Sequence, residues 1–112
     1  STLEAHIEQW RNALATRDAI AYLSLYAEDF RYRGLERGEW ASFRAAQLAV
    51  PVATEVKLYD VLILADPEDE DLVMTRFRAT VTRDAQRATW TKRLYWRRAG
   101  EGRFQIIAEN ND

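Results

Sequence analysis

The chain has 112 residues, long enough for one domain to bury a hydrophobic core without disulfide bonds or a structural metal. Its formal net charge of −2 excludes the basic surplus that is typical of proteins binding nucleic acid or anionic membranes. Four tryptophans, five tyrosines and four phenylalanines exclude a disordered segment, and the absence of cysteine excludes a thiolate nucleophile and a cysteine-ligated zinc.

The first sixteen residues predict a helix. Residues 1–4 read as a capping box, in which a hydroxyl and a glutamate three residues later satisfy free backbone N–H groups. Apolar residues then recur at helical spacing at Leu3, Ile7, Trp10 and Leu14. The only histidine, His6, lies one residue before Ile7, so we expect it on the exposed face of this helix.

Two further helices and a short strand are predicted before Pro51. Asp18 is an N-cap candidate for a second helix, which carries an aromatic stripe and ends near Glu28. Residues 30–33 alternate apolar and basic side chains before a glycine, as in a strand with one covered face. Residues 37–50 show helical spacing until the proline, which cannot continue a helix.

The second half of the chain changes to the period of β-strands. Val, Ile, Leu, Thr and aromatic residues fill segments 54–65, 72–83, 88–98 and 103–109. Short connections at 66–71, 84–87 and 99–102 predict an antiparallel meander. The acidic connection 66–71 lacks the glycine and spaced ligands of a calcium loop, which favours a solvated hairpin loop. Helices first and sheet last give a two-layer α+β fold in one domain, residues 1–112.

The expected strand pairing brings a lysine and a glutamate together. A hairpin closed at 84–87 places three residues of one strand opposite three of the next: Phe77, Ala79 and Val81 opposite Leu94, Lys92 and Trp90. A turn at 99–102 then places Lys92 opposite Glu109 and Leu94 opposite Ile107. Lys92 and Glu109 are therefore expected as neighbours on the apolar face, as a structural ion pair or as a ligand anchor.

Helices that cover this face leave a cone-shaped pocket, with large aromatic residues at its wider end and a few polar groups aimed inward. The alternative is that these aromatics fill the core. The candidate ligand-binding residues are Trp10, Tyr22, Tyr26, Trp40, Arg44, Phe77, Lys92, Trp96 and Glu109.

Short motifs in a fixed order carry a family resemblance. They are Trp10-x-x-Ala13, Asp18-x3-Tyr22-x3-Tyr26-x2-Asp29-Phe30, Trp40-x3-Arg44, Lys92-x-Leu94-x-Trp96 and Phe104-x-Ile106-Ile107-x-Glu109. The chain resembles the NTF2-like superfamily, the SnoaL and ketosteroid-isomerase-like cone fold. Its last two strands look like the NTF2-like accessory domain of L,D-transpeptidase-type cell-envelope proteins. That subfamily tends to carry a glutamine and a tyrosine after the Phe77 position, where this chain has Ala79 and Val81.

The resemblance implies a cone of three N-terminal helices on a curved antiparallel sheet, often dimeric through the sheet. It also implies a periplasmic or cell-envelope location. Enzymes and non-catalytic binding modules both use this fold, so the residues of the site must decide between them.

The catalytic groups of the enzymes with this fold are missing. Resemblance to ketosteroid isomerases calls for a carboxylate base after the first strand and a phenol on helix one, but Gly34 and Trp10 hold those positions. Dehydratase-like members use a histidine with a carboxylate, and His6 is expected to be exposed. Asp29 follows a predicted helix and precedes a predicted strand, a position that is typical of a turn or capping residue rather than a catalytic one. No catalytic residue, metal or cofactor is therefore expected.

We expect a non-catalytic binding or accessory domain with an aromatic-lined pocket for a small molecule, a peptidoglycan fragment or a partner segment, beside a larger envelope protein. The first alternative is a stand-alone enzyme, an isomerase or hydrolase of an apolar substrate that uses Lys92 and Glu109. The second is a structural module that dimerises through its sheet. No apolar run approaches the roughly 18 residues of a spanning helix, so no membrane insertion is expected.

Overall fold

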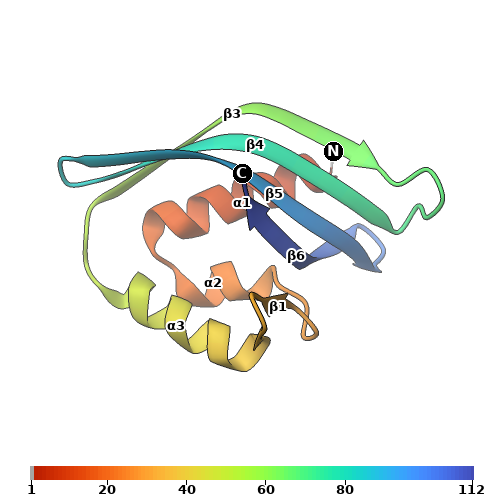
Figure 1. Ribbon diagram of the computed structural model, residues 1–112, viewed down its shortest axis with the longest axis horizontal. Helices are drawn as coiled ribbons and strands as arrows, with labels where there is room; N and C mark the ends of the chain where they lie inside the picture. Colours follow the sequence, from red (N-terminus) through yellow and green to blue (C-terminus); the bar gives the residue numbers. More distant parts are fainter. Residues whose placement is uncertain (1) are drawn as a thin grey trace.

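The computed structural model describes residues 2–112, and in it a layer of helices lies against one face of a curved sheet (Figure 1). The helices are α1 (Thr2–Thr16), α2 (Ala19–Ser24) and α3 (Arg37–Ala49). The sheet has the order β3-β4-β5-β6, formed by β3 (Thr54–Ala65), β4 (Leu72–Arg83), β5 (Gln86–Gly100) and β6 (Arg103–Asn111). All neighbouring strands in it are antiparallel, which confirms the predicted α+β fold of three helices on a curved antiparallel sheet.

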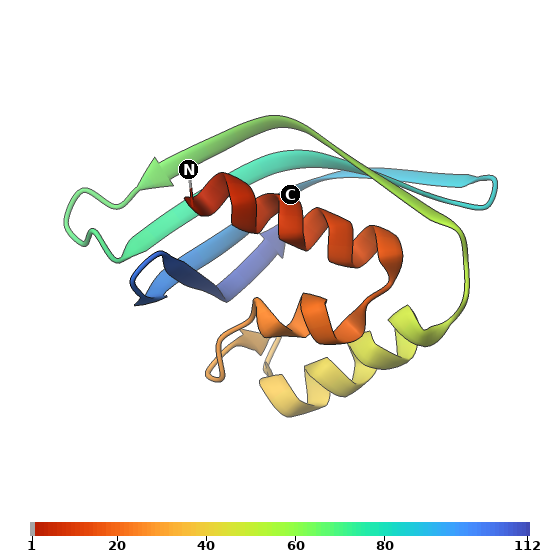
Figure 2. The ribbon, with the colours of Figure 1, turned by 180° about the vertical axis from the view of Figure 1, so that it is seen from behind.

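Helix α1 lies across the concave face of the sheet, as Figure 2 shows from behind. Its apolar stripe of Leu3, Ile7, Trp10, Ala13 and Leu14 is buried, because residues three and four apart share one face of a helix. The expected helix is confirmed, while the Ser1 part of the expected capping box lies outside the described residues. None of the helices in residues 2–112 is long and apolar enough to cross a membrane.

Helix α2 is shorter than its sequence pattern indicated. Asp18 is its N-cap, with a side chain that accepts a hydrogen bond of 3.1 Å from the Ala21 amide. The expected end near Glu28 is wrong, since the helix ends at Ser24. The backbone then turns to the sheet, where the Ile106 N–H donates to Leu25 O at 2.7 Å and the Ala27 N–H donates to Ile106 O at 2.8 Å.

A small hairpin separates α2 from α3. The expected strand at 30–33 is present as β1 (Arg31–Tyr32), and it pairs with β2 (Leu35–Glu36), which the sequence pattern did not reveal. Arg33 and Gly34 form the turn with φ values of 48° and 84°. Two successive positive φ angles suit the twist of a tight hairpin, and glycine adopts them readily.

The pairing of β4 with β5 differs from the expected register by two residues. Phe77 lies opposite Lys92, and Ala79 lies opposite Trp90. The expected pairs are wrong because the hairpin closes through a two-residue turn in which Arg83 pairs with Gln86 and Asp84 has a φ of 53°. A shift of two residues leaves every side chain on its expected face, so Lys92 still faces the helices.

The pairing of β5 with β6 is also shifted. Lys92 lies opposite Asn111 and Leu94 lies opposite Glu109, so the expected pairs of Lys92 with Glu109 and of Leu94 with Ile107 are wrong. Irregularities between Tyr95 and Trp96 and between Arg98 and Gly100 change the register along the ladder. Lys92 and Glu109 thus become diagonal neighbours.

Candidate functional site

A pocket of about 410 Å³ opens between α3 and the concave side of β4, β5 and β6. Its wall combines apolar, aromatic and polar side chains: Leu14, Tyr32, Leu35, Trp40, Phe43, Arg44, Gln47, Arg83, Trp90, Lys92, Glu109 and Asn111. Phe43 remains 66% exposed, which is unusual for so large an apolar side chain. The volume falls in the range of small-molecule sites in proteins.

A buried ion pair forms one wall of this pocket. Lys92 Nζ and Glu109 Oε2 are 2.5 Å apart, and the two side chains are 7% and 5% exposed. The opposite charges offset much of the cost of removing each from water. The expected contact between the two residues is present, although their strand positions are diagonal rather than opposite.

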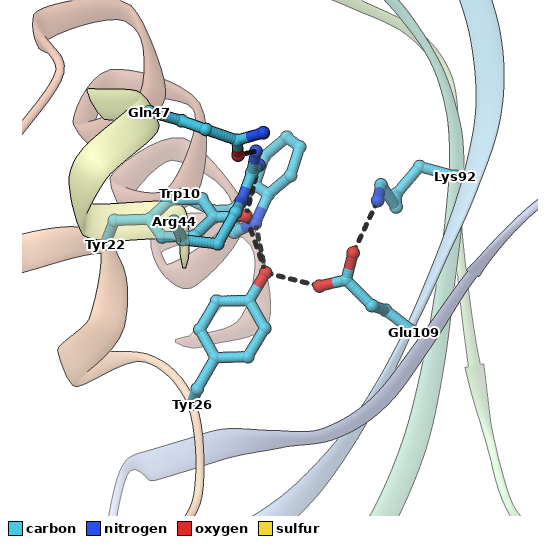
Figure 3. A network of polar contacts seen from close by, with 7 residues as sticks. All are labelled: Trp10, Tyr22, Tyr26, Arg44, Gln47, Lys92 and Glu109. Atoms are coloured by element: carbon cyan, nitrogen blue, oxygen red, sulfur yellow. Dashed lines mark hydrogen bonds and ion pairs between the residues drawn. The ribbon is translucent and has the colours of Figure 1, made fainter. Parts of the chain in front are cut away.

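Two tyrosines behind the pocket extend the ion pair into a hydrogen-bonded chain (Figure 3). The Tyr26 hydroxyl lies 2.5 Å from Glu109 Oε1, and it accepts a hydrogen bond of 3.1 Å from the Trp10 indole. The hydroxyls of Tyr26 and Tyr22 share a hydrogen bond of 3.0 Å. Because Tyr26 gives its one proton to the carboxylate, Tyr22 donates to Tyr26.

Burial raises the pKa of Tyr22 and raises the pKa of Tyr26 well above the usual 10.0, and the Glu109 charge adds to both effects. Both phenols therefore stay protonated at neutral pH and hold the Glu109 carboxylate as hydrogen-bond donors, directly or through one another. Neither phenol is a base in the neutral range.

Arg44 completes the chain at the α3 side. Its Nη2 donates to the Tyr22 hydroxyl at 2.9 Å, and its Nη1 donates to Gln47 Oε1 at 2.9 Å. The guanidinium also lies 5.1 Å from the centroid of the Tyr22 ring. An unbroken series of polar contacts thus runs from Arg44 through both tyrosines to Glu109 and Lys92 (Figure 3).

The structure separates the sequence-derived candidates into two groups. Trp40, Arg44, Lys92 and Glu109 line the pocket. The aromatics Trp10, Tyr22, Tyr26 and Phe77 are at most 1% exposed and lie in the core behind it, and Trp96, 0% exposed, lies further along β5. Large apolar rings between a helix layer and a sheet are excluded from water, which accounts for their place in the core.

The sequence analysis missed eight residues of the pocket wall, among them Phe43, Arg83 and Trp90. The period of two along β5 could have found Trp90, since it lies two residues before Lys92 and must share its face. Arg83 could have been found in the same way on β4, where it follows Val81 by two residues. Neither signal identifies which part of the face the helices leave open.

His6 is not the surface residue that its position suggested. It is half-buried, its Nδ1 lies 2.8 Å from Thr2 O, and its Nε2 accepts a hydrogen bond of 3.3 Å from the Phe104 amide. The prediction is wrong because His6 sits three residues after Leu3, at the border of the buried stripe. Asp29 lies in the expected turn, and its carboxylate binds Arg97 at 2.9 and 3.1 Å.

The described residues contain no cluster of side chains that could bind a metal ion. Within residues 2–112, no three histidine, cysteine, aspartate or glutamate side chains lie close enough together to hold an ion. The carboxylate of the pocket, Glu109, has a lysine and a phenol as its partners instead.

Fold and site together define an NTF2-like domain, a helix layer on a bent sheet with a pocket between them. More narrowly, the chain belongs to the family of Cds6 C-terminal NTF2-like domains, whose family model matches residues 2–110. No curated protein sequence matches the chain.

Solved structures agree with this fold. The helical cell shape determining protein Pgp2 of Campylobacter jejuni, as its K307A mutant, superposes with a TM-score of 0.86 at 22% identity, covering 96% of this chain and 39% of that one. Bd1075 of Bdellovibrio bacteriovorus gives 0.84 at 22% identity, covering 98% and 40%. A putative NTF2-like dehydratase of Streptomyces avermitilis gives 0.80 at 12% identity, covering 96% and 90%. The chain thus spans about two fifths of Pgp2 and Bd1075.

Proposed function

We propose that this domain is a non-catalytic binding module whose pocket takes a small molecule or a partner segment within a larger cell-envelope protein. The observation that carries the proposal is an open pocket whose wall mixes exposed aromatic surface with fixed polar groups. Ligand sites in proteins have this composition, with apolar walls for affinity and few polar groups for orientation.

The state of the polar groups favours binding over catalysis. Both Glu109 oxygens have partners, Lys92 on one side and Tyr26 on the other. A general base needs a carboxylate that is free to take a proton from the substrate. In this pocket the carboxylate orders the wall instead, and a rigid wall loses less entropy when it binds a ligand.

The comparisons support the second half of the proposal. Pgp2 is described as a helical cell shape determining protein, and this fold makes up only part of its chain. By analogy, the domain would serve a protein of the periplasm or cell envelope as an accessory module.

Binding of a neutral aromatic compound, naphthalene-2-acetamide, tests the proposal. Isothermal calorimetry should detect saturable binding to the wild-type protein, and Trp90→Ala should weaken it by about tenfold, because Trp90 supplies a wall of the pocket. The matched control is Tyr59→Ala, which removes a 47% exposed aromatic side chain outside the pocket and should leave the affinity unchanged. Equal affinity in wild type and Trp90→Ala would contradict the proposal.

An enzyme of the same fold is the second candidate, favoured by the coupled Lys92, Glu109 and Tyr26 with a raised phenol pKa. It predicts turnover of an apolar ester or an unconjugated cyclic enone that Glu109→Gln abolishes. Absence of turnover in wild-type protein that binds the naphthalene compound would favour the binding module.

A dimerisation module is the third candidate, favoured by exposed apolar side chains along β3, namely Tyr59, Val61, Leu62 and Leu64. It predicts twice the monomer mass of 13.1 kDa at micromolar concentration in analytical ultracentrifugation. Leu62→Lys with Leu64→Lys should then restore the monomer.

A further inference from the structure

The carboxylate of the pocket and the side-chain oxygen of Gln47 already have hydrogen-bond partners. Glu109 is the carboxylate among the described pocket residues, and Lys92 and Tyr26 occupy its two oxygens. Gln47 gives its side-chain oxygen to Arg44. A ligand in this pocket therefore meets few acceptors that are free to receive its hydrogen bonds.

Two donors of the same wall have no partner. The Trp90 Nε1–H is buried and makes no hydrogen bond within residues 2–112, and the Arg83 side chain makes neither a hydrogen bond nor an ion pair there. The two residues belong to adjacent strands, and both line the pocket. A buried donor without an acceptor costs free energy, so an acceptor on the ligand would be stabilising.

Positive charge accumulates at the same end. Arg17, Arg44 and Arg83 line one adjoining depression of about 270 Å³, and Arg44 and Arg83 line the pocket as well. No carboxylate in the described part of the chain forms an ion pair with any of the three. Glu109 is the ion-pair partner of Lys92, so none of the three arginines has a carboxylate partner of its own in the described part of the chain.

Hydrogen bonds from the Arg17 side chain to the end of α3 hold Arg17 beside Arg44 and Arg83. The Arg17 Nε donates to Val50 O at 2.7 Å and its Nη2 donates to Gln47 O, which satisfies carbonyls at the end of α3. Burial, followed by the charges of Arg83 and Arg44, lowers the pKa of Arg17. The charges of Arg83 and Arg44 thus act on Arg17, and all three residues line the same depression.

We propose that the pocket selects a ligand carrying an oxyanion, a carboxylate or a phosphate, which Arg44, Arg83 and the indole N–H of Trp90 hold at the junction of the two cavities. The proposal rests on the binding function proposed above and names the chemistry of its ligand. Guanidinium groups match the planar, paired oxygens of a carboxylate or phosphate. The oxyanion supplies the missing acceptor for Trp90 and offsets the repulsion among the arginines. The apolar part of the ligand lies against Phe43 and the Trp90 ring.

A matched pair of compounds isolates the charged group. Naphthalene-2-acetate differs from naphthalene-2-acetamide only in its carboxylate, and wild-type protein should bind the acetate about tenfold more tightly by calorimetry. Arg83→Gln should abolish this difference. The control Arg78→Gln removes the same charge from the same strand, but on the opposite face of the sheet, and should keep the difference.

A second readout follows the Trp90 indole directly. In ¹H–¹⁵N spectra, inorganic phosphate and acetate should each move the Trp90 indole signal saturably in wild type and not in Arg83→Gln. The affinities of naphthyl phosphate and naphthalene-2-acetate then decide which oxyanion the site prefers.

The outcomes separate the two proposals. If acetamide and acetate bind equally well, the oxyanion inference is overturned while the proposed pocket function stands. If the acetamide does not bind but phosphate or acetate still moves the Trp90 signal, the oxyanion site stands and the proposed function falls. Equal losses in Arg78→Gln and Arg83→Gln would also overturn the inference, since they would indicate general attraction by surface charge.

Discussion

Trp96 and Trp90 lie on the same face of β5, yet they have opposite environments. Trp96 is 0% exposed, its indole N–H donates to Thr75 Oγ1 at 2.9 Å, and its ring meets His6 edge-on at 5.8 Å. Trp90 is half-buried, and its indole N–H has no partner among residues 2–112. One face of one strand thus serves as closed core at one end and as pocket wall at the other.

The helices cause this difference. The first turns of α1 cover the Trp96 end, while the β4–β5 hairpin extends past the helix layer (Figures 1 and 2). At the end that α1 covers, the Trp96 indole N–H has an internal partner. Where the sheet extends beyond the helices, the Trp90 indole N–H and the Arg83 guanidinium remain available to donate hydrogen bonds to a ligand.

The largest expected effect is at the closed end. Trp96→Ala should lower the free energy of unfolding by about 3–5 kcal/mol, because it leaves a cavity in a core that cannot collapse to fill it. Trp90→Ala, with its side chain only half-buried, should lose at most about half as much. Urea unfolding of both variants measures this, and equal losses would remove the distinction between the two ends.

The Lys92–Glu109 ion pair lies between the Trp90 and Trp96 ends of β5. Breaking it should lower the free energy of unfolding nearly as much as Trp96→Ala does. Lys92→Met should destabilise the protein by about 3 kcal/mol, because it leaves the Glu109 carboxylate buried without a cation. The double variant Lys92→Met/Glu109→Gln should recover part of this loss. A cost below about 1 kcal/mol in the single variant would mean that water reaches Glu109, and that Lys92 serves the ligand rather than the fold.

The variant Thr75→Val makes the Trp96 indole resemble the Trp90 indole, whose N–H has no hydrogen-bond partner among residues 2–112. The variant keeps the shape of the side chain but leaves the Trp96 indole without an acceptor, which should cost about 1–3 kcal/mol. Thr80→Val is the matched control, since Thr80 and Thr89 share an exposed contact, and it should change stability by less than about 0.5 kcal/mol. Equal effects of the two variants in urea unfolding would show that the Trp96 hydrogen bond contributes little.

The tyrosines behind the pocket predict a smaller, pH-dependent effect. The pKa of Tyr22 and of Tyr26 is raised in the folded protein, so the unfolded chain loses these protons first as pH rises above about 10. Their stabilisation is complete below pH 10 and is lost above it, by less than about 1 kcal/mol for each tyrosine at pH 10.5. Urea unfolding between pH 8 and 11 should show a shallower decline in Tyr26→Phe, whereas Tyr59→Phe should follow wild type.

Local sequence patterns predicted much of this molecule, and they failed where contacts between distant residues decide the structure. The spacing of Leu3, Ile7 and Trp10 predicted α1, because a helix has a fixed period. The predicted end of the second helix near Glu28 was wrong because Leu25 and Ala27 hydrogen-bond to Ile106, a contact that no local pattern encodes. In the site, Arg44, Lys92 and Glu109 were expected, but Arg83 was not, since its exposure depends on where the helices end.

By itself, the sequence determined the order of the elements and the face of each strand residue. Alternation has a period of two, so Lys92 faced the helices under either register. Only the tertiary structure decided which residues meet: Tyr26 reaches Glu109 across 83 residues, and Arg17 of the turn after α1 converges with Arg44 of α3 and Arg83 of β4. Such contacts depend on turn geometry, bulges and the extent of helix coverage, and these are set by the packing of the whole chain.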